Sequence, residues 1–344
     1  MEPGDNAGRD PQSGRSLGGA YWPVMVVGFL LLGATPGCSQ LRDPSVPEPI
    51  HQRIEPESGT EYLLYAPSNY DHTKSWPLVV VCHGAKPWDS PRRQIGHWLK
   101  LAEEHGFVVA APHLSGTPGD FPPAAEKQIK RQNEDERLIL DVVRHVRGGY
   151  SISADRIFLT GWSGGSYAVL HTGLSHPDLF RALAILKGRF DSAYLTDLAS
   201  RIDPYQPVYT LFSSFDHAIG SDVKACNDWL VEHGAALTAD RSASTSADAP
   251  GKAFAFFERV IRQVPWLHIY AVRDDRSTRM RRRFEAVGSF EPITYEWTFG
   301  DGHDAPVATP IHTYRDPGTY TVTLVAGLPG AKQTVRRTLE ISVP

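Results

Sequence analysis

Ser163 stands in the stretch "GWSGG" (161–165), a G-x-S-x-G pattern whose residue types suit nucleophilic catalysis. An apolar run at 156–160 precedes it and a helix-compatible segment follows, so the serine is expected at a sharp turn between a strand and a helix. Glycines permit such a turn, and the helix start offers the backbone N–H of Gly164 to a developing oxyanion. The pattern predicts a serine that attacks a carbonyl carbon. The alternative is a glycine-lined turn in which the serine only caps a helix.

The chain around this pattern alternates between strand-like and helix-like segments from Gly59 to about residue 265. Short runs of consecutive apolar residues predict buried strands, whereas the amphipathic stretches between them predict helices. The alternation predicts an α/β fold with a doubly wound, mostly parallel sheet that helices cover on both faces. Strands are expected at 60–67, 77–84, 107–113, 156–161, 182–188 and 207–216, and helices at 94–106, 126–149, 166–174, 222–234 and 251–263.

A different pattern begins near residue 266, where no long helical period remains. Tyr295, Trp297 and Phe299 alternate with polar residues, and a glycine-rich turn follows at 300–302. The segment 318–327 alternates in the same way. This part of the chain predicts a small, all-β, immunoglobulin-like sandwich.

Three segments, "VVVCHG", "RIFLTGWSGGS" with "LSHPDLF" behind it, and "PVYTLFSSFD", resemble the α/β-hydrolase superfamily. Within it, the chain is most similar to secreted esterases of the feruloyl-esterase and polyhydroxybutyrate-depolymerase type, over residues 58–265. The resemblance implies hydrolysis of a carboxylic ester, either of a small molecule or linked to a polymer, with Ser163 as the nucleophile. It also implies that Gly164 and the loop at Gly84 and Ala85 hold the oxyanion.

The same resemblance implies an acid after the strand that ends in "TLFSSFD", and Asp216 takes that place; its alternative role is a cap for the next helix. A histidine is then expected after the last strand, but the segment 236–260 contains none. Without a base, a serine hydroxyl is a weak nucleophile at neutral pH. His83, His113 and His217 each follow a predicted strand and are expected on the rim where the strands end. His217 is the best placed by chain order, whereas His83 is better suited to supporting the oxyanion loop.

Two functions of different kinds therefore remain open. The first is an exported serine esterase whose base has moved away from the expected loop. The second is a catalytically silent hydrolase fold that is retained for binding or as a scaffold. Hydrolysis of another bond, such as a peptide bond, rests on the fold alone.

The segment "YEWTFGDGHDAPVATPIHTYRDPGTYTVTLVAG" resembles the PKD domain, and the resemblance covers about residues 268–344. It implies that Trp297 fills the core, that His312 is structural, and that the domain acts as a spacer or a surface-binding module. Asp301 and Asp304 are compatible with calcium, but a role in the turn suffices, so no metal site is predicted. The matching parts are Trp297, the turn at 299–302, the triplet at 312–314 and the triplet at 318–320.

The N-terminal segment resembles an export signal. Residues 20–33 form one apolar block whose length fits a signal peptide better than a spanning helix. Gly37-Cys38 resembles the end of a bacterial lipoprotein signal, which implies lipidation of Cys38; a plain secretory signal and a single membrane anchor are the alternatives. The protein is expected to be exported, as a periplasmic, membrane-anchored or extracellular protein. The expected domains are a signal segment at 1–38, a linker at 39–57, a hydrolase domain at 58–265 and a PKD domain at 266–344.

Composition narrows the range of partners. The formal net charge of −4 over 344 residues is too small to suggest nucleic acid, and a membrane is expected to be met only through the N-terminal segment. Cys82 and Cys226 lie in apolar stretches and predict buried thiols rather than a disulfide framework. The basic run at 276–284 suggests contact with an acidic glycan or a cell surface; the alternative is a solvated strand edge. No cofactor is predicted.

Overall fold

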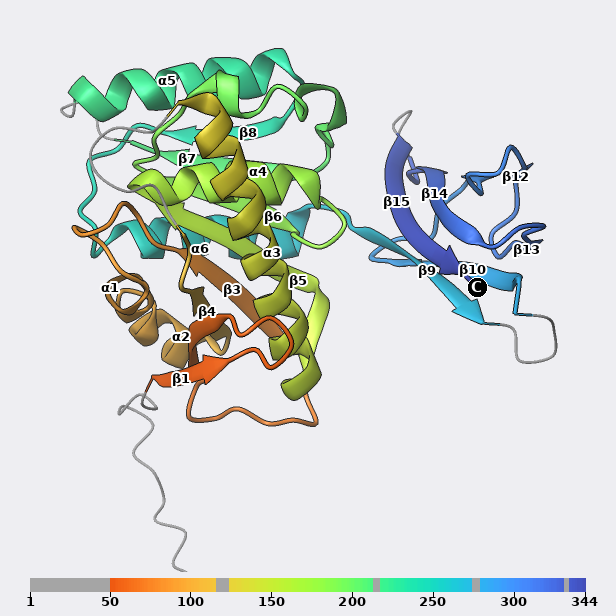
Figure 1. Ribbon diagram of the computed structural model, residues 1–344, viewed down its shortest axis with the longest axis horizontal. Coiled ribbons are helices and arrows are strands. Elements are labelled where there is room, and N and C mark those ends of the chain that lie inside the picture. Colours follow the sequence, from red (N-terminus) through yellow and green to blue (C-terminus); the bar gives the residue numbers. More distant parts are fainter. Residues whose placement is uncertain (1–49, 116–123, 213–216, 274–278, 331–333) are drawn as a thin grey trace, which may run out of the picture. The chain divides into compact units, whose positions relative to one another are not determined.

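The computed structural model describes residues 50–115, 124–212, 217–273, 279–330 and 334–344, and Figure 1 shows their helices and strands. The predicted export segment with Cys38, and the predicted acid Asp216, lie outside these residues. No helix within the described ranges is long and apolar enough to cross a membrane.

One sheet of eight strands forms the centre of the first domain, in the order β1-β2-β4-β3-β5-β6-β7-β8. The strands from β3 to β8 pair in parallel, whereas β1 and β2 pair antiparallel. This arrangement confirms the predicted α/β class with a mostly parallel sheet. The strands are β1 His51–Ile54, β2 Glu61–Tyr65, β3 Trp76–Cys82, β4 Val108–Pro112, β5 Ile152–Trp162, β6 Ala182–Leu186, β7 Pro207–Leu211 and β8 Ala236–Asp240.

Helices cover both faces of this sheet (Figure 1). Successive strand residues point to opposite faces, so Val80 belongs to the core on one face of the sheet, whereas its neighbours Val79 and Val81 belong to the core on the other face. Cys82 and Cys226 are buried free thiols of the first of these cores, as predicted. The helices are α1 Pro91–Gly96, α2 Leu99–His105, α3 Ala125–Gly149, α4 Ser166–Ser175, α5 His217–Glu232 and α6 Ala249–Gln263.

The structure differs from the prediction at the start of the first domain. Residues 51–54, which the Pro- and Glu-rich composition assigned to a linker, form β1 and pair with β2 at the edge of the sheet. Their side chains are mostly exposed, so the strand has no apolar pattern to reveal it. It forms because the edge of β2 offers backbone hydrogen-bonding groups that need partners.

The second domain is a small β-sandwich of two antiparallel sheets, as predicted. One sheet has the order β13-β10-β9 and the other the order β12-β11-β14-β15. Trp297 and Phe284 are fully buried between them, and the Trp297 indole N–H donates to the Val307 carbonyl at 3.0 Å. The strands are β9 Leu267–Arg273, β10 Arg281–Gly288, β11 Tyr295–Thr298, β12 Asp304–Ala305, β13 Ile311–Thr313, β14 Gly318–Gly327 and β15 Thr334–Val343.

The basic run at 276–284 is not a solvated strand edge over its described part. Residues 281–284 begin β10, which is the middle strand of its sheet. The Arg282 side chain is buried, and its guanidinium donates to the carbonyls of Arg279 and Arg281. The strand-edge interpretation failed because charge alone does not reveal which strand is central.

Candidate active site

Ser163 lies at the turn between β5 and α4. β5 ends at Trp162, a 3₁₀ turn spans Ser163–Gly165, and α4 begins at Ser166. The φ angle of Ser163 is 51°, in the left-handed region that a residue with a side chain enters only at an energetic cost. A serine held in this strained conformation between a strand and a helix has the backbone geometry of a nucleophile elbow.

The two outer glycines of the pattern are required by close packing. A Cβ on Gly161 would lie 2.7 Å from the Gly165 carbonyl oxygen and 2.7 Å from Val169 Cγ2. A Cβ on Gly165 would lie 2.6 Å from the carbonyl oxygen of Cys82, at the end of β3. Real Cβ atoms do not approach backbone atoms so closely, so only glycine lets α4 start directly against the strand ends.

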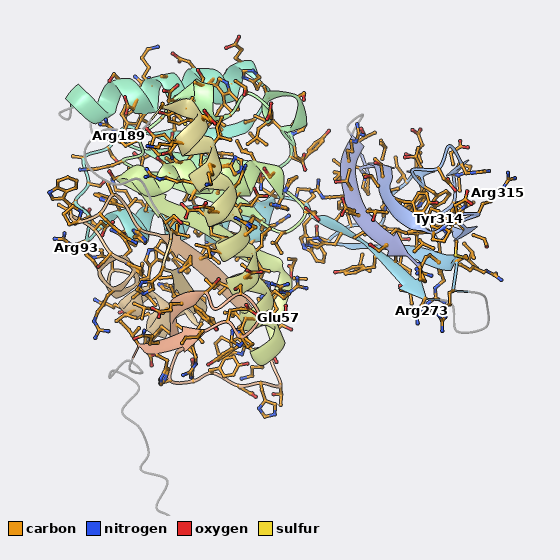
Figure 2. The ribbon with its side chains drawn as sticks, viewed as in Figure 1. Glu57, Arg93, Arg189, Arg273, Tyr314 and Arg315 are labelled. Carbon is orange, nitrogen blue, oxygen red and sulfur yellow. The ribbon has the colours of Figure 1, made fainter. Side chains whose placement is uncertain are left out.

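Ser166 fixes the backbone of the elbow, a role that the sequence analysis did not find. Its Oγ lies 2.6 Å from the carbonyl oxygens of both Ser163 and Arg189, and it accepts the N–H of Arg189 at 2.8 Å. The Arg189 N–H also points to the Ser163 carbonyl at 3.2 Å. The guanidinium of Arg189, which Figure 2 labels, pairs with Asp222 of α5 at 3.1 Å. The only signal of this role in the sequence is that Ser166, a polar residue, stands at a helix position that the pattern predicts to be buried.

The loop after β3 runs beside Ser163, as the resemblance implied. The position that a Cβ on Gly84 would occupy is 3.4 Å from Ser163 Cβ, 3.1 Å from the Trp162 carbonyl oxygen and 3.0 Å from Asp89 Oδ2. The Gly84 N–H donates to that Asp89 oxygen at 2.6 Å. Of the predicted oxyanion donors, Gly84 therefore has its N–H engaged within the loop.

Asp89 organises this loop, although the sequence analysis did not single it out. Its carboxylate accepts not only the Gly84 N–H but also the Gln94 side-chain amide and the Ser90 N–H, both at 2.8 Å. Its own N–H donates to the Ala85 carbonyl at 3.0 Å. The aspartate thus ties the residues after β3 to the start of α1. It comes five residues after Gly84, a spacing with no recognised meaning.

The three candidate histidines differ in their surroundings. His83 is buried, and its Nδ1 lies 2.8 Å from the Gly84 carbonyl, to which it must donate. Burial is the main reason that the pKa of His83 is lowered from its ordinary value of 6.5. His113 is exposed and follows β4, which β3 separates from β5. His217 begins α5, just after the undescribed Asp216. No described contact joins His83 or His113 to Ser163.

The end of β8, where the family's histidine is expected, carries other residues with partners of their own. Asp240 accepts the Tyr209 hydroxyl at 2.7 Å and the Ser242 N–H at 2.8 Å. The Arg241 guanidinium lies 5.7 Å from the centre of the Phe212 ring. Since residues 236–260 contain no histidine, this loop supplies no imidazole to Ser163.

Comparison with known proteins agrees with the fold. A model of the prolyl oligopeptidase family matches residues 94–217, and a PKD-domain model matches residues 269–343. The chain is an α/β-hydrolase-fold protein with a C-terminal PKD domain. Both predicted resemblances are thereby confirmed.

The relatives of this chain include proteins named as an esterase/xylanase, a dipeptidyl-peptidase and a depolymerase. A bifunctional acetylxylan esterase/xylanase, XynS20E of Neocallimastix patriciarum, is 26% identical over 34% of this chain and 16% of its own length. Dipeptidyl-peptidase 5 of Porphyromonas gingivalis is 27% identical over 36% of this chain and 19% of its own. Poly(3-hydroxyalkanoate) depolymerase C of Paucimonas lemoignei is 28% identical over 33% of this chain and 28% of its own length. The matched part therefore covers between 16% and 28% of the length of each of these relatives.

Proposed function

We propose that the protein hydrolyses carboxylic esters with Ser163 as its nucleophile. The observation that carries the proposal is the strained φ of 51° at Ser163, in an elbow that the close packing of Gly161 and Gly165 maintains. Strain of this kind persists where the surrounding structure enforces it, and it recurs at functional sites. The esterase and depolymerase relatives support an ester as the substrate.

In the proposed reaction, Ser163 Oγ attacks the ester carbonyl carbon and passes its proton to a base. The carbonyl oxygen becomes an oxyanion, which accepts the backbone N–H groups of Gly164 and Ala85. The Gly84 N–H stays with Asp89 and orders the loop instead. The alcohol then leaves with a proton, and water hydrolyses the acyl-enzyme by the same steps.

The base in this proposal is His217, supported by Asp216. This pair retains the chain order serine, acid, histidine that the α/β-hydrolase fold uses. Two observations argue against the other candidates. The His83 Nδ1 is already engaged with the Gly84 carbonyl and the ring is buried, and the strand before His113 lies on the far side of β3 from Ser163.

Export and attachment to the cell surface complete the proposal. The apolar block at 20–33 and Cys38 support passage through a membrane, with lipidation of the cysteine as the anchor. The PKD domain then acts as a spacer, or binds the polymer or surface that carries the ester. Mass spectrometry of the mature N-terminus tests this part, because a mature chain that lacks Cys38 excludes the lipid anchor.

A matched pair of chromogenic substrates tests the reaction class. We expect the full chain to release p-nitrophenol from p-nitrophenyl acetate, and Ser163→Ala to abolish the release. Ser175→Ala, at the other end of α4, is the control and is expected to keep full activity. Cleavage of a dipeptidyl p-nitroanilide without ester cleavage would instead indicate a peptidase, as in part of the matched family. A folded protein that cleaves neither would indicate a binding domain on a hydrolase fold.

A further inference from the structure

Two histidines and one aspartate converge in the PKD domain. Asp301 and His303 lie in the turn between β11 and β12, and His312 lies in β13. One ligand atom from each side chain lies within 4.8 Å of the other two. Asp301 Oδ1 is 3.3 Å from His303 Nδ1, and Asp301 Oδ2 is 2.7 Å from His312 Nε2.

We propose that these three residues bind a divalent transition-metal ion, of which Zn²⁺ is the natural candidate. Imidazole nitrogens with one carboxylate are a donor set that suits zinc, whereas calcium takes oxygen ligands. Neighbouring ligand atoms in a tetrahedral zinc site lie about 3.3 Å apart, given bonds of about 2.0 Å. The Asp301 Oδ1–His303 Nδ1 separation already has this value, His312 Nε2 lies 2.7 Å from the other oxygen of the same carboxylate, and one ligand atom from each residue lies within 4.8 Å of the other two. Three protein ligands leave the fourth position to water.

The surrounding sandwich holds the side chains of His312 and Asp301 in place. The His312 ring stacks on Phe299 with a centroid distance of 4.3 Å and meets Tyr314, labelled in Figure 2, edge-on at 4.6 Å. Asp301 sits between Gly300 and Gly302, whose φ angles of 81° and 89° fix a tight turn. Two of the three ligands are therefore positioned before an ion arrives.

Two of the three ligand side chains are mostly buried, and the third is mostly exposed. The side chains of His312 and Asp301 are 12% and 15% exposed, whereas that of His303 is 57% exposed. Arg282 pairs with His312 across the β10–β13 ladder, but its positive charge is turned away from the cluster. Its guanidinium donates to the carbonyls of Arg279 and Arg281. An ion can thus reach the cluster from solvent on the His303 side.

The site would join the two sheets of the sandwich. Asp301 and His303 belong to a turn of the four-stranded sheet, and His312 belongs to the three-stranded sheet. Without an ion, a hydrogen bond from His312 Nε2 to Asp301 makes this connection. Metal binding would need the lone pair of Nε2, so the proton must move to Nδ1 or to solvent. The ion would then replace this hydrogen bond with two coordinate bonds to the turn and one to His312 of the other sheet.

Titration with Co²⁺, whose visible absorption reports tetrahedral coordination, tests the site in the full chain after treatment with a chelator. We expect one Co²⁺ per chain, displacement by Zn²⁺, and a Tm that rises with Zn²⁺. His303→Ala keeps the His312–Asp301 hydrogen bond, so it should fold normally, bind on the order of 100-fold more weakly and lose the Zn²⁺-dependent rise in Tm.

A second carboxylate with two imidazoles provides the matched control. Glu136 contacts His171 at 2.9 Å and His176 at 2.6 Å. Unlike the ligand atoms of Asp301, His303 and His312, however, the ligand atoms of these three described residues do not all lie within 4.8 Å of one another. His176→Ala should leave Co²⁺ binding unchanged. Equal affinity in the wild type and His303→Ala, loss of binding in His176→Ala alone, or no tetrahedral Co²⁺ spectrum from the folded wild type would each overturn the proposal.

Discussion

The Asp89 carboxylate accepts the backbone N–H of Gly84 at 2.6 Å, at a residue where an added Cβ would lie 3.4 Å from Ser163 Cβ. A carboxylate in this place does two things. It occupies an N–H that would otherwise be free to bind a carbonyl oxygen, and it fixes the direction of the peptide that follows. In the proposed mechanism, the N–H of Ala85 is then the donor that this loop presents to the oxyanion.

Asp89→Ala should lower both activity and stability. The substitution leaves the Gly84 N–H and the Gln94 amide without their acceptor, which costs about 1–3 kcal/mol of unfolding free energy. A loosened oxyanion loop should lower kcat by about 10- to 100-fold with little change in KM. Asp71→Ala, which removes an aspartate that accepts the Thr73 N–H at 2.9 Å in a remote loop, is the control for kcat.

Asp89→Asn separates positioning from general destabilisation. Its amide oxygen can still accept the Gly84 N–H, so kcat should recover in part. If Asp89→Ala and Asp71→Ala had the same kcat, the role of Asp89 in the oxyanion loop would be refuted.

Gly165→Ala should be among the most damaging small substitutions in the chain. The new methyl group would meet the carbonyl oxygens of Cys82 and His83 at 2.6 and 2.7 Å, and backbone atoms of a central strand end have no room to retreat. We expect urea unfolding to show a free energy of unfolding that is lower by about 2 kcal/mol or more. Gly251→Ala in α6 is the matched control, since its Cβ meets nothing within 4 Å, and it should gain about 0.5–1 kcal/mol. Equal effects of the two substitutions would show that the elbow is not packed as described.

His217→Ala tests the assignment of the base. If His217 accepts the Ser163 proton, its loss should lower kcat for p-nitrophenyl acetate by about 1,000-fold or more, with an unchanged Tm. His113→Ala, an exposed histidine on the other side of β3, should keep kcat within about twofold. Retention of activity in His217→Ala together with its loss in His113→Ala would move the base to His113.

Glu136 should make the stability of the first domain depend on acid pH. Burial alone would raise the pKa of this carboxyl, but close contacts from His171 and His176 outweigh burial and lower the pKa from 4.5 to about 2. Because the folded pKa is depressed, the stabilisation is complete above pH 4.5 and disappears as the pH falls toward 2. Just above pH 4.5, Glu136→Gln should lower the free energy of unfolding by on the order of 2 kcal/mol. The difference from the wild type should shrink as the pH falls below 4.5. Urea unfolding at several pH values measures this, with the exposed Glu126→Gln of the same helix as the control.

Local pattern was enough to predict the architecture and the elbow, because both follow from short-range sequence. Apolar runs with glycine stops gave the parallel strands, and "GWSGG" placed Ser163 at the strand–helix turn. Asp89 and Ser166 could not be predicted, since each acts through contacts that exist only once the chain folds, Asp89 with Gly84 and Ser166 with Arg189.

What the sequence could not predict in the second domain has a similar cause. His312 was assigned a structural role from its motif, and its hydrogen bond to Asp301 fits that assignment. The approach of His303 to the same carboxylate depends on the exact path of the turn, which no spacing rule predicts. Arg282 was expected at a strand edge because its charge concealed the central position of β10.

The central claim is that Ser163 is an activated nucleophile, and covalent labelling with a fluorophosphonate tests it most directly. The purified full chain and Ser163→Ala would be treated side by side at neutral pH, and the labelled peptide would be identified by mass spectrometry. The account predicts stoichiometric phosphonylation of Ser163 in the wild type and none in the variant. A folded wild-type protein that takes up no label, or takes it up at another residue, would contradict it.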